Sequence, residues 1–134
     1  MFNNADMTDV ELFYLSLHGE GLLLNDHFSL GEFACKDGSD VVLVHPLLTA
    51  LLEGIRLTVG RPVNLTNAFR SHLHNIAVGG SPRSKHLYGM AADIWIEGMA
   101  PIEIAEIADD VEAGGIYIYD NFCHIDVYGF GRRG

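Results

Sequence analysis

The apolar residues of this chain fall into short runs, and the longest purely aliphatic one is Val41–Val44. A helix that crosses a membrane needs about 20 consecutive apolar residues, so we expect no membrane insertion. The chain has 134 residues, of which 49% are hydrophobic and 19% charged, which argues against a disordered or fibrous protein. The length predicts a single domain over residues 1–134. Cys35 and Cys123 can form at most one bridge, and we expect both as free thiols.

Periodicity and turn signals assign helices and strands to most of the chain, whereas residues 1–26 give no clear assignment. Apolar residues recur at helical spacing over 45–59, where Pro46 suits the first turn and Gly60 the end. The other elements that we expect are a short helix from Leu30 to near the turn at 36–38, a strand over 62–69, a polar connection over 71–85, a strand over 90–96, a helix from Pro101 to about Ala113, and strands over 116–119 and 123–128. This order predicts an α+β fold with a small, mostly antiparallel sheet flanked by helices.

Charges are unevenly distributed along the chain. It has 18 acidic and 8 basic residues and a formal charge of −10, which argues against nucleic acid or an anionic membrane as its partner. Residues 54–92 contain no acid, and their basic residues are Arg56, Arg61, Arg70, Arg83 and Lys85. This basic segment suggests a local site for a ligand with carboxylates, although the same side chains could lie scattered on a solvated surface.

Four residues are candidates for metal chemistry: His86, Asp93, His124 and Asp126. Asp93 interrupts the apolar run 90–96, where a buried carboxylate is costly unless it is paired or bound to a metal. His124 and Asp126 are two residues apart, so in a strand both project from the same face. Two imidazoles and one carboxylate leave one open position on a tetrahedral zinc, as metallohydrolases require. Without a metal, the alternative for each histidine is a surface or hydrogen-bonded position, and for each aspartate it is a structural hydrogen bond.

The segment SKHLYGMAAD, residues 84–93, resembles the S-x-H-x-x-G-x-A-x-D motif of the D-alanyl-D-alanine carboxypeptidase-like zinc peptidases. Further segments follow the pattern of the same family in the same order: 28–35, NAFRS at 67–71 with HNIAVGG at 74–80, GGIYIY at 114–119 and FCHIDV at 122–127. The resemblance covers about residues 27–128. This family includes L-alanyl-D-glutamate endolysins and murein endopeptidases, and it shares its fold with hedgehog signalling domains. The resemblance therefore implies a peptidase domain of the hedgehog type.

Carried over by position, the resemblance implies roles for individual residues. The zinc ligands of the family fall on His86, Asp93 and His124. Arg70 falls where the family binds a substrate carboxylate, which suits its planar fork of donors, and Ser84 falls where a serine assists substrate binding. The position of the general base is assigned less directly. Many relatives have an acid three residues before the last histidine ligand, whereas this chain has Asn121 there. Asp126 is the first candidate for the base and Asp120 the second, and Asp126 could instead orient a ligand.

The resemblance implies zinc-dependent hydrolysis of an amide bond in the peptide stem or cross-link of peptidoglycan. Carboxypeptidase and endopeptidase activities both agree with the same ligand set. The alternative is a non-catalytic zinc- or peptide-binding module of the same fold. A nuclease built on His72, His74 and Asn75 is a third possibility, which the acidic composition disfavours.

The expected partners are peptidoglycan peptides, with no nucleic acid, and the expected oligomeric state is a monomer. The first basic residue is Lys36, so the sequence shows no positively charged start of a signal peptide. We therefore expect synthesis in the cytoplasm and action on the cell wall or in the periplasm, for example after release by another factor during phage lysis.

Overall fold

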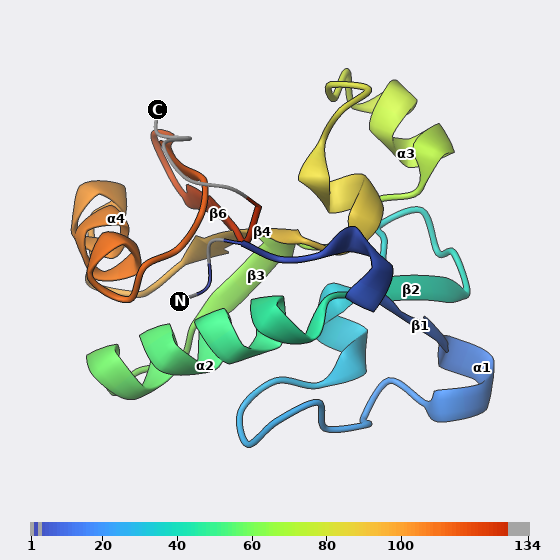
Figure 1. Ribbon diagram of the computed structural model, residues 1–134, viewed down its shortest axis with the longest axis horizontal. Coiled ribbons are helices and arrows are strands. Elements are labelled where there is room, and N and C mark those ends of the chain that lie inside the picture. Colours follow the sequence, from blue (N-terminus) through green and yellow to red (C-terminus); the bar gives the residue numbers. More distant parts are fainter. Residues whose placement is uncertain (1, 3, 129–134) are drawn as a thin grey trace.

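The computed structural model describes residue 2 and residues 4–128, and its strands form two sheets (Figure 1). The larger sheet has the order β3-β4-β6-β5 and consists of β3 (Asn64–Asn67), β4 (Ala91–Trp95), β6 (Cys123–Asp126) and β5 (Ile116–Ile118). The smaller sheet pairs β1 (Glu11–Tyr14) with β2 (Val41–Val44). The pairings between these strands are antiparallel, which confirms the predicted α+β class.

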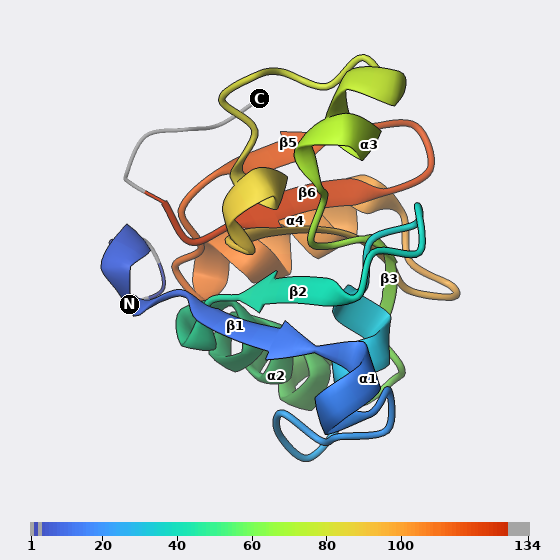
Figure 2. The ribbon, with the colours of Figure 1, turned by 90° about the vertical axis from the view of Figure 1, so that its right-hand side faces the viewer.

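Helices cover the two faces of the larger sheet unequally. The longer helices, α2 (Pro46–Val59) and α4 (Pro101–Asp110), lie on one side, and α4 packs against β5 and β6 (Figure 2). The opposite side is occupied by α3 (His72–Ala77) and the 3-10 turn η3 (Lys85–Tyr88), which leave part of that face open. The remaining elements are the short helix α1 (Leu15–His18) and the 3-10 turns η1 (Met7–Asp9) and η2 (Leu30–Phe33).

Helix α2 forms where the sequence predicts it, because its ends and its apolar face agree. Pro46 occupies the first turn, and Gly60 ends the helix with a left-handed φ of 66°. The side chains of Leu48, Leu51, Leu52 and Ile55 are each 0% exposed and form much of the core. Burial of each such side chain stabilises the fold by about 1.5–3 kcal/mol.

Strands β4 and β6 are the centre of the larger sheet, and their side chains alternate between the core and the open face. Cys123 and Ile125 are fully buried on the side of α4, as the predicted period of two requires. Asp93 of β4 lies directly opposite His124 of β6 in the ladder. Side chains at such paired positions are about 5 Å apart at Cβ, so the sheet itself brings these two residues together on the open face.

Several elements differ from the sequence prediction. The unassigned segment 1–26 contains β1 and α1, and the connection 71–85 contains α3. The predicted helix from Leu30 is only the 3-10 turn η2, and α4 ends at Asp110 rather than near Ala113. Both cysteines are free and buried, as predicted. Within the described residues, none of the helices has the length and apolar character needed to cross a membrane.

Candidate metal centre

The metal ligands predicted from the sequence meet at the open face of the larger sheet. Asp93 and His124 come from the paired strands β4 and β6, and His86 comes from η3 above them. The hydroxyl of Ser84 accepts a hydrogen bond from the His86 N–H at 3.3 Å and so caps the turn that presents His86. Gly89 ends this turn with a φ of 67°, and a Cβ there would collide with the Leu43 carbonyl of β2. The turn is therefore fixed against the smaller sheet.

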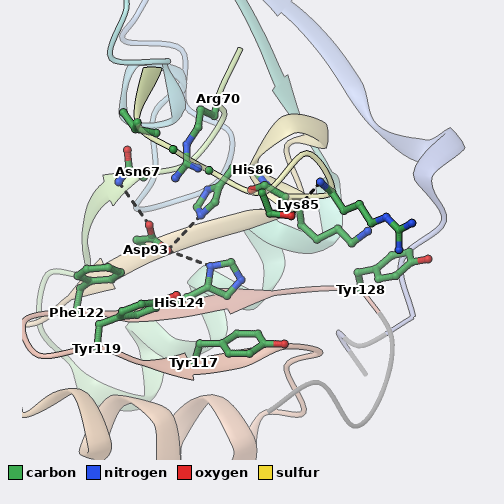
Figure 3. A pocket seen from close by; sticks show the side chains of 16 residues that line it. Asn67, Arg70, Lys85, His86, Asp93, Tyr117, Tyr119, Phe122, His124 and Tyr128 are labelled. Carbon is green, nitrogen blue, oxygen red and sulfur yellow. Dashed lines mark hydrogen bonds and ion pairs between the residues drawn. The ribbon is translucent and has the colours of Figure 1, made fainter. Parts of the chain in front are cut away.

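The two imidazoles converge on one carboxylate oxygen of Asp93 (Figure 3). His86 Nε2 lies 3.2 Å and His124 Nδ1 3.1 Å from Asp93 Oδ1. One nitrogen or oxygen atom from each of the three residues lies within 4.8 Å of the others, which is compatible with ligation of one metal ion. His86 is 3% and Asp93 5% exposed, so these polar groups are costly to bury without a strong partner.

A partner on the far side of each imidazole fixes the orientation of the ring. His86 Nδ1 lies 2.7 Å from the Ala68 carbonyl oxygen, and since a carbonyl oxygen only accepts, Nδ1 carries the proton. His124 is arranged in the reverse sense, with Nε2 3.0 Å from Asp126 Oδ2 and Nδ1 toward Asp93. In the neutral imidazoles, the remaining lone pairs of both rings would therefore face Asp93. A cation bound among the three groups satisfies all of them, so this donor set fits a divalent metal ion.

The same contacts shift the protonation equilibria. Burial lowers the pKa of His124, but its hydrogen bonds with Asp126 and Asp93 outweigh burial and raise the pKa above the usual 6.5. Burial raises the pKa of Asp93, yet hydrogen bonds with His124 and His86 hold it below the usual range. For Asp126, the hydrogen bond and the charge of His124 likewise outweigh burial and lower the pKa. Both carboxylates are therefore ionised at neutral pH, as a metal centre requires.

Asp126 lies behind His124 rather than at the open pocket. Its side chain is 0% exposed, and Oδ1 accepts hydrogen bonds from the N–H groups of Gly115 at 2.8 Å and Tyr128 at 3.0 Å. The contact between Oδ2 and His124 Nε2 confirms that His124 and Asp126 share a strand face. A general base has to reach a water molecule, so this enclosure favours the ligand-orienting role over the base that the sequence suggested first.

The other predicted site residues have different positions. Arg70 and Ser84 both line the pocket next to the three ligands, and Arg70 points toward it from the segment after β3 (Figure 3). Asp120, the second candidate for the base, is exposed and does not line the pocket. His72 and His74 lie on α3 and do not belong to the cluster of metal-binding groups.

The pocket above the ligands has a volume of about 740 Å³, within the range of small-molecule sites. Among the residues that the structure describes, three basic side chains line it, Arg70, Arg83 and Lys85, whereas Asp93 is the only acid that does so. Three of the five basic residues of the segment 54–92 thus line this pocket. A pocket with this balance attracts anionic ligands to an otherwise acidic protein.

Aromatic side chains form a further part of the wall, which the sequence analysis did not assign. Tyr119 and Phe122 stack with ring centroids 4.6 Å apart, and the Tyr117 ring lies edge-on to His124 at 5.4 Å. All three line the pocket (Figure 3). Tyr117 and Tyr119 are two residues apart in the chain, the spacing that places strand residues on one face, so alternation was the signal available. Asn67 was also missed as a site residue, and its amide donates to Asp93 Oδ2 at 3.4 Å.

Comparison with known proteins agrees with this geometry. Over 82 residues the chain is 37% identical to the peptidoglycan L,D-endopeptidase MepK of Escherichia coli (strain K12), and equally similar to the proteins of that name from Escherichia coli O157:H7 and Shigella flexneri. Each match covers 56% of this chain and 44% of the relative, so the chain corresponds to less than half of these curated relatives. The model of the Peptidase M15 family matches residues 26–126, which include the three residues of the candidate metal site. The resemblance predicted from the sequence is confirmed, and the chain belongs to the Peptidase M15 family.

Proposed function

We propose that this chain is a zinc-dependent peptidase that hydrolyses an amide bond in peptidoglycan peptides. The observation that supports this most strongly is the arrangement of His86 and His124 around Asp93 in an open pocket. Hydrogen bonds to the Ala68 carbonyl and to Asp126 orient the two imidazole rings toward Asp93. Three protein ligands are the number found in catalytic zinc sites, which keep a further position for water or substrate. The name of the relatives, peptidoglycan L,D-endopeptidase, supplies the substrate class.

Zinc held by His86, Asp93 and His124 would lower the pKa of a bound water and polarise the scissile carbonyl group. The protein residues would bind and orient the substrate. Arg70 binds a peptide carboxylate through its planar fork of donors, and Asp126 keeps His124 in the tautomer that presents Nδ1 to the metal. Binding the carboxylate at a fixed place restricts the motion of the peptide over the ligands, which favours reaction.

An endopeptidase is favoured over a D-alanyl-D-alanine carboxypeptidase, because the relatives named above are endopeptidases. Action on the cell wall follows from this substrate. Release during phage lysis and a monomeric state remain predictions from the sequence.

The test is mass spectrometry of purified muropeptides after incubation with the zinc-loaded protein, with and without a chelator. We expect new peptide fragments whose masses identify the bond, and no fragments after chelation. The variant His86→Ala serves as the matched control, since a site with two protein ligands rarely retains zinc. Cleavage that persists in the chelated protein or in His86→Ala contradicts the proposal.

The second candidate is a zinc-dependent binding module that does not turn over its ligand. One observation favours it: among the residues that the structure describes, Asp93 is the only acid that lines the pocket, so a separate carboxylate base is not in place there. A module predicts that the zinc-loaded protein binds a muropeptide without cleaving it. Calorimetric titration of the protein that was assayed by mass spectrometry distinguishes the two functions.

A further inference from the structure

Asn75 of α3 holds the guanidinium group of Arg70 through a hydrogen bond of fixed orientation. Arg70 Nη1 donates to Asn75 Oδ1 at 2.9 Å, and Asn75 Nδ2 donates to the Ser81 carbonyl oxygen at 2.9 Å. A guanidinium group only donates and a carbonyl oxygen only accepts, so the carboxamide of Asn75 has a single possible orientation. Asn75 is 3% exposed, and these bonds are therefore largely protected from competition by water.

The main chain around Asn75 fixes the carboxamide in place. The Asn75 N–H donates to the Ser71 carbonyl at 2.9 Å, and the Asn75 carbonyl accepts from the Gly80 N–H at 2.8 Å. Gly80 is needed for space: a Cβ there would collide with Asn75 Oδ1 and lie 2.6 Å from Arg70 Nη1. The segment around Gly80 thus closes over the contact between Asn75 and Arg70.

Arg70 is anchored at both ends. Its main-chain N–H donates to the His86 carbonyl at 3.0 Å, which connects it to the turn that carries a metal ligand. Its side chain is held at the tip by Asn75. Within the part of the chain that the structure describes, no acidic side chain forms an ion pair with Arg70. The neutral amide of Asn75 therefore fixes the direction of the guanidinium group and leaves its positive charge uncancelled.

We propose that Asn75 is a positioning residue that keeps the charged Arg70 aimed into the pocket, so that the enzyme prefers a peptide carboxylate to the corresponding carboxamide. An acidic side chain at position 75 would pair with Arg70 and cancel its charge, whereas an amide does not. The inference rests on the proposed peptidase function, and it adds a determinant of substrate charge to it.

The experiment compares two short stem peptides that differ only in one group, a free carboxylate or its carboxamide. For wild type we expect a lower KM for the carboxylate peptide. In Asn75→Asp we expect kcat/KM for the carboxylate peptide to fall about 10- to 100-fold, mainly through KM, which is the value of one charge-assisted hydrogen bond. For the carboxamide peptide, kcat/KM should change less than about threefold, since binding of this peptide does not depend on the charge of Arg70.

Controls separate this role from a general effect on folding or charge. Asn64→Asp on β3 makes the same change of charge outside the pocket, so kcat/KM for both peptides should stay as in wild type. Zinc content and the cooperativity of unfolding are measured for every variant, and Asn75→Ala replaces Asn75→Asp if the latter does not fold. In an Arg70→Gln background, Asn75→Asp should have no further effect on selectivity, because the two residues act as a unit.

An equal loss for both peptides, or an unchanged preference in Asn75→Asp, overturns the positioning role. A wild-type enzyme that cleaves both peptides equally well overturns it too, while the proposed function stands. If zinc-loaded wild type neither binds nor cleaves either peptide, the proposed function itself fails.

Discussion

The carboxylate of Asp126 determines which nitrogen of His124 faces the metal centre, and Asp126→Asn tests this directly. The N–H groups of Gly115 and Tyr128 both need an acceptor, so the amide oxygen of the variant takes the place of Oδ1. The amide NH₂ group then takes the place of Oδ2, which lies 3.0 Å from His124 Nε2 in wild type. Because an NH₂ group only donates, Nε2 has to accept the hydrogen bond. The proton of the imidazole moves to Nδ1 as a consequence, and a protonated nitrogen cannot bind a metal.

The expected effect follows from this reversal of the tautomer. Loss of an outer partner of a metal ligand usually costs about 10- to 100-fold in metal affinity. Because the variant favours the wrong tautomer as well, we expect the upper end, about 100-fold or about 2.7 kcal/mol. Competition for zinc with a chromophoric chelator measures this value, and excess zinc should restore turnover. Asp120→Asn removes the same charge from an exposed position and should bind zinc with an affinity within about twofold of wild type.

Other outcomes would refute this reasoning. If Asp126→Asn binds zinc like wild type but loses about 100-fold or more in turnover, Asp126 is the general base and the argument from its enclosure is wrong. If Asp120→Asn retains zinc and loses turnover, the base is Asp120. Wild-type zinc affinity and turnover in Asp126→Asn would reject both roles for Asp126.

Four further predictions concern the same centre and the core beside it. His86→Ala should bind less than about a tenth of an equivalent of zinc, as measured by elemental analysis, because only two ligands remain. Arg70→Lys keeps the charge but loses the planar fork, so kcat/KM on a carboxylate peptide should fall about tenfold or more in a steady-state assay. The raised pKa of His124 stabilises the metal-free fold fully below pH 6.5, and this contribution is lost as the pH rises through the raised value. Zinc, in contrast, binds only the neutral ring. The difference in Tm between zinc-loaded and chelated protein should therefore widen from about pH 6 to about pH 8. Burial, together with the charge of Asp93, raises the pKa of Cys123 to about 12, so mass spectrometry should find Cys123 unmodified by iodoacetamide in the folded protein at about pH 8.

The family resemblance pointed to His86, Asp93 and His124 as candidate metal ligands, and two of these three also have a local signal in the sequence. Asp93 interrupts an apolar strand, and His124 and Asp126 have the spacing of two that places side chains on one face of a strand. The long helix α2 was predicted for a similar reason, since its caps and its apolar period agree. The role of Asp126 was not decided by its spacing, because the spacing gives the face of the strand and not the depth of burial.

The missed elements depend on contacts between distant residues. Strand β1 is largely exposed, and it is defined by its pairing with β2, about 30 residues further along the chain. Helix α3 has no apolar face toward the core: Leu73 is 80% and Ile76 74% exposed. It is held instead by polar contacts, namely the cap from Ser71 and the hydrogen bonds of Asn75. Hydrophobic periodicity cannot detect a helix of this kind.

The pairing of β1 with β2 sets a limit on how far this protein can be shortened. The family match begins at residue 26, beyond β1. A fragment cut at that boundary would expose the edge of β2, whose four residues are all aliphatic, and it would lose the 2.9 Å hydrogen bond from the Ala5 N–H to the Val127 carbonyl. Unpaired aliphatic edges pair with the same edges of other molecules, so such a fragment would aggregate through β2 although it still contained all three candidate metal ligands. Fragments for expression or crystallisation should therefore retain the residues from Ala5 onward.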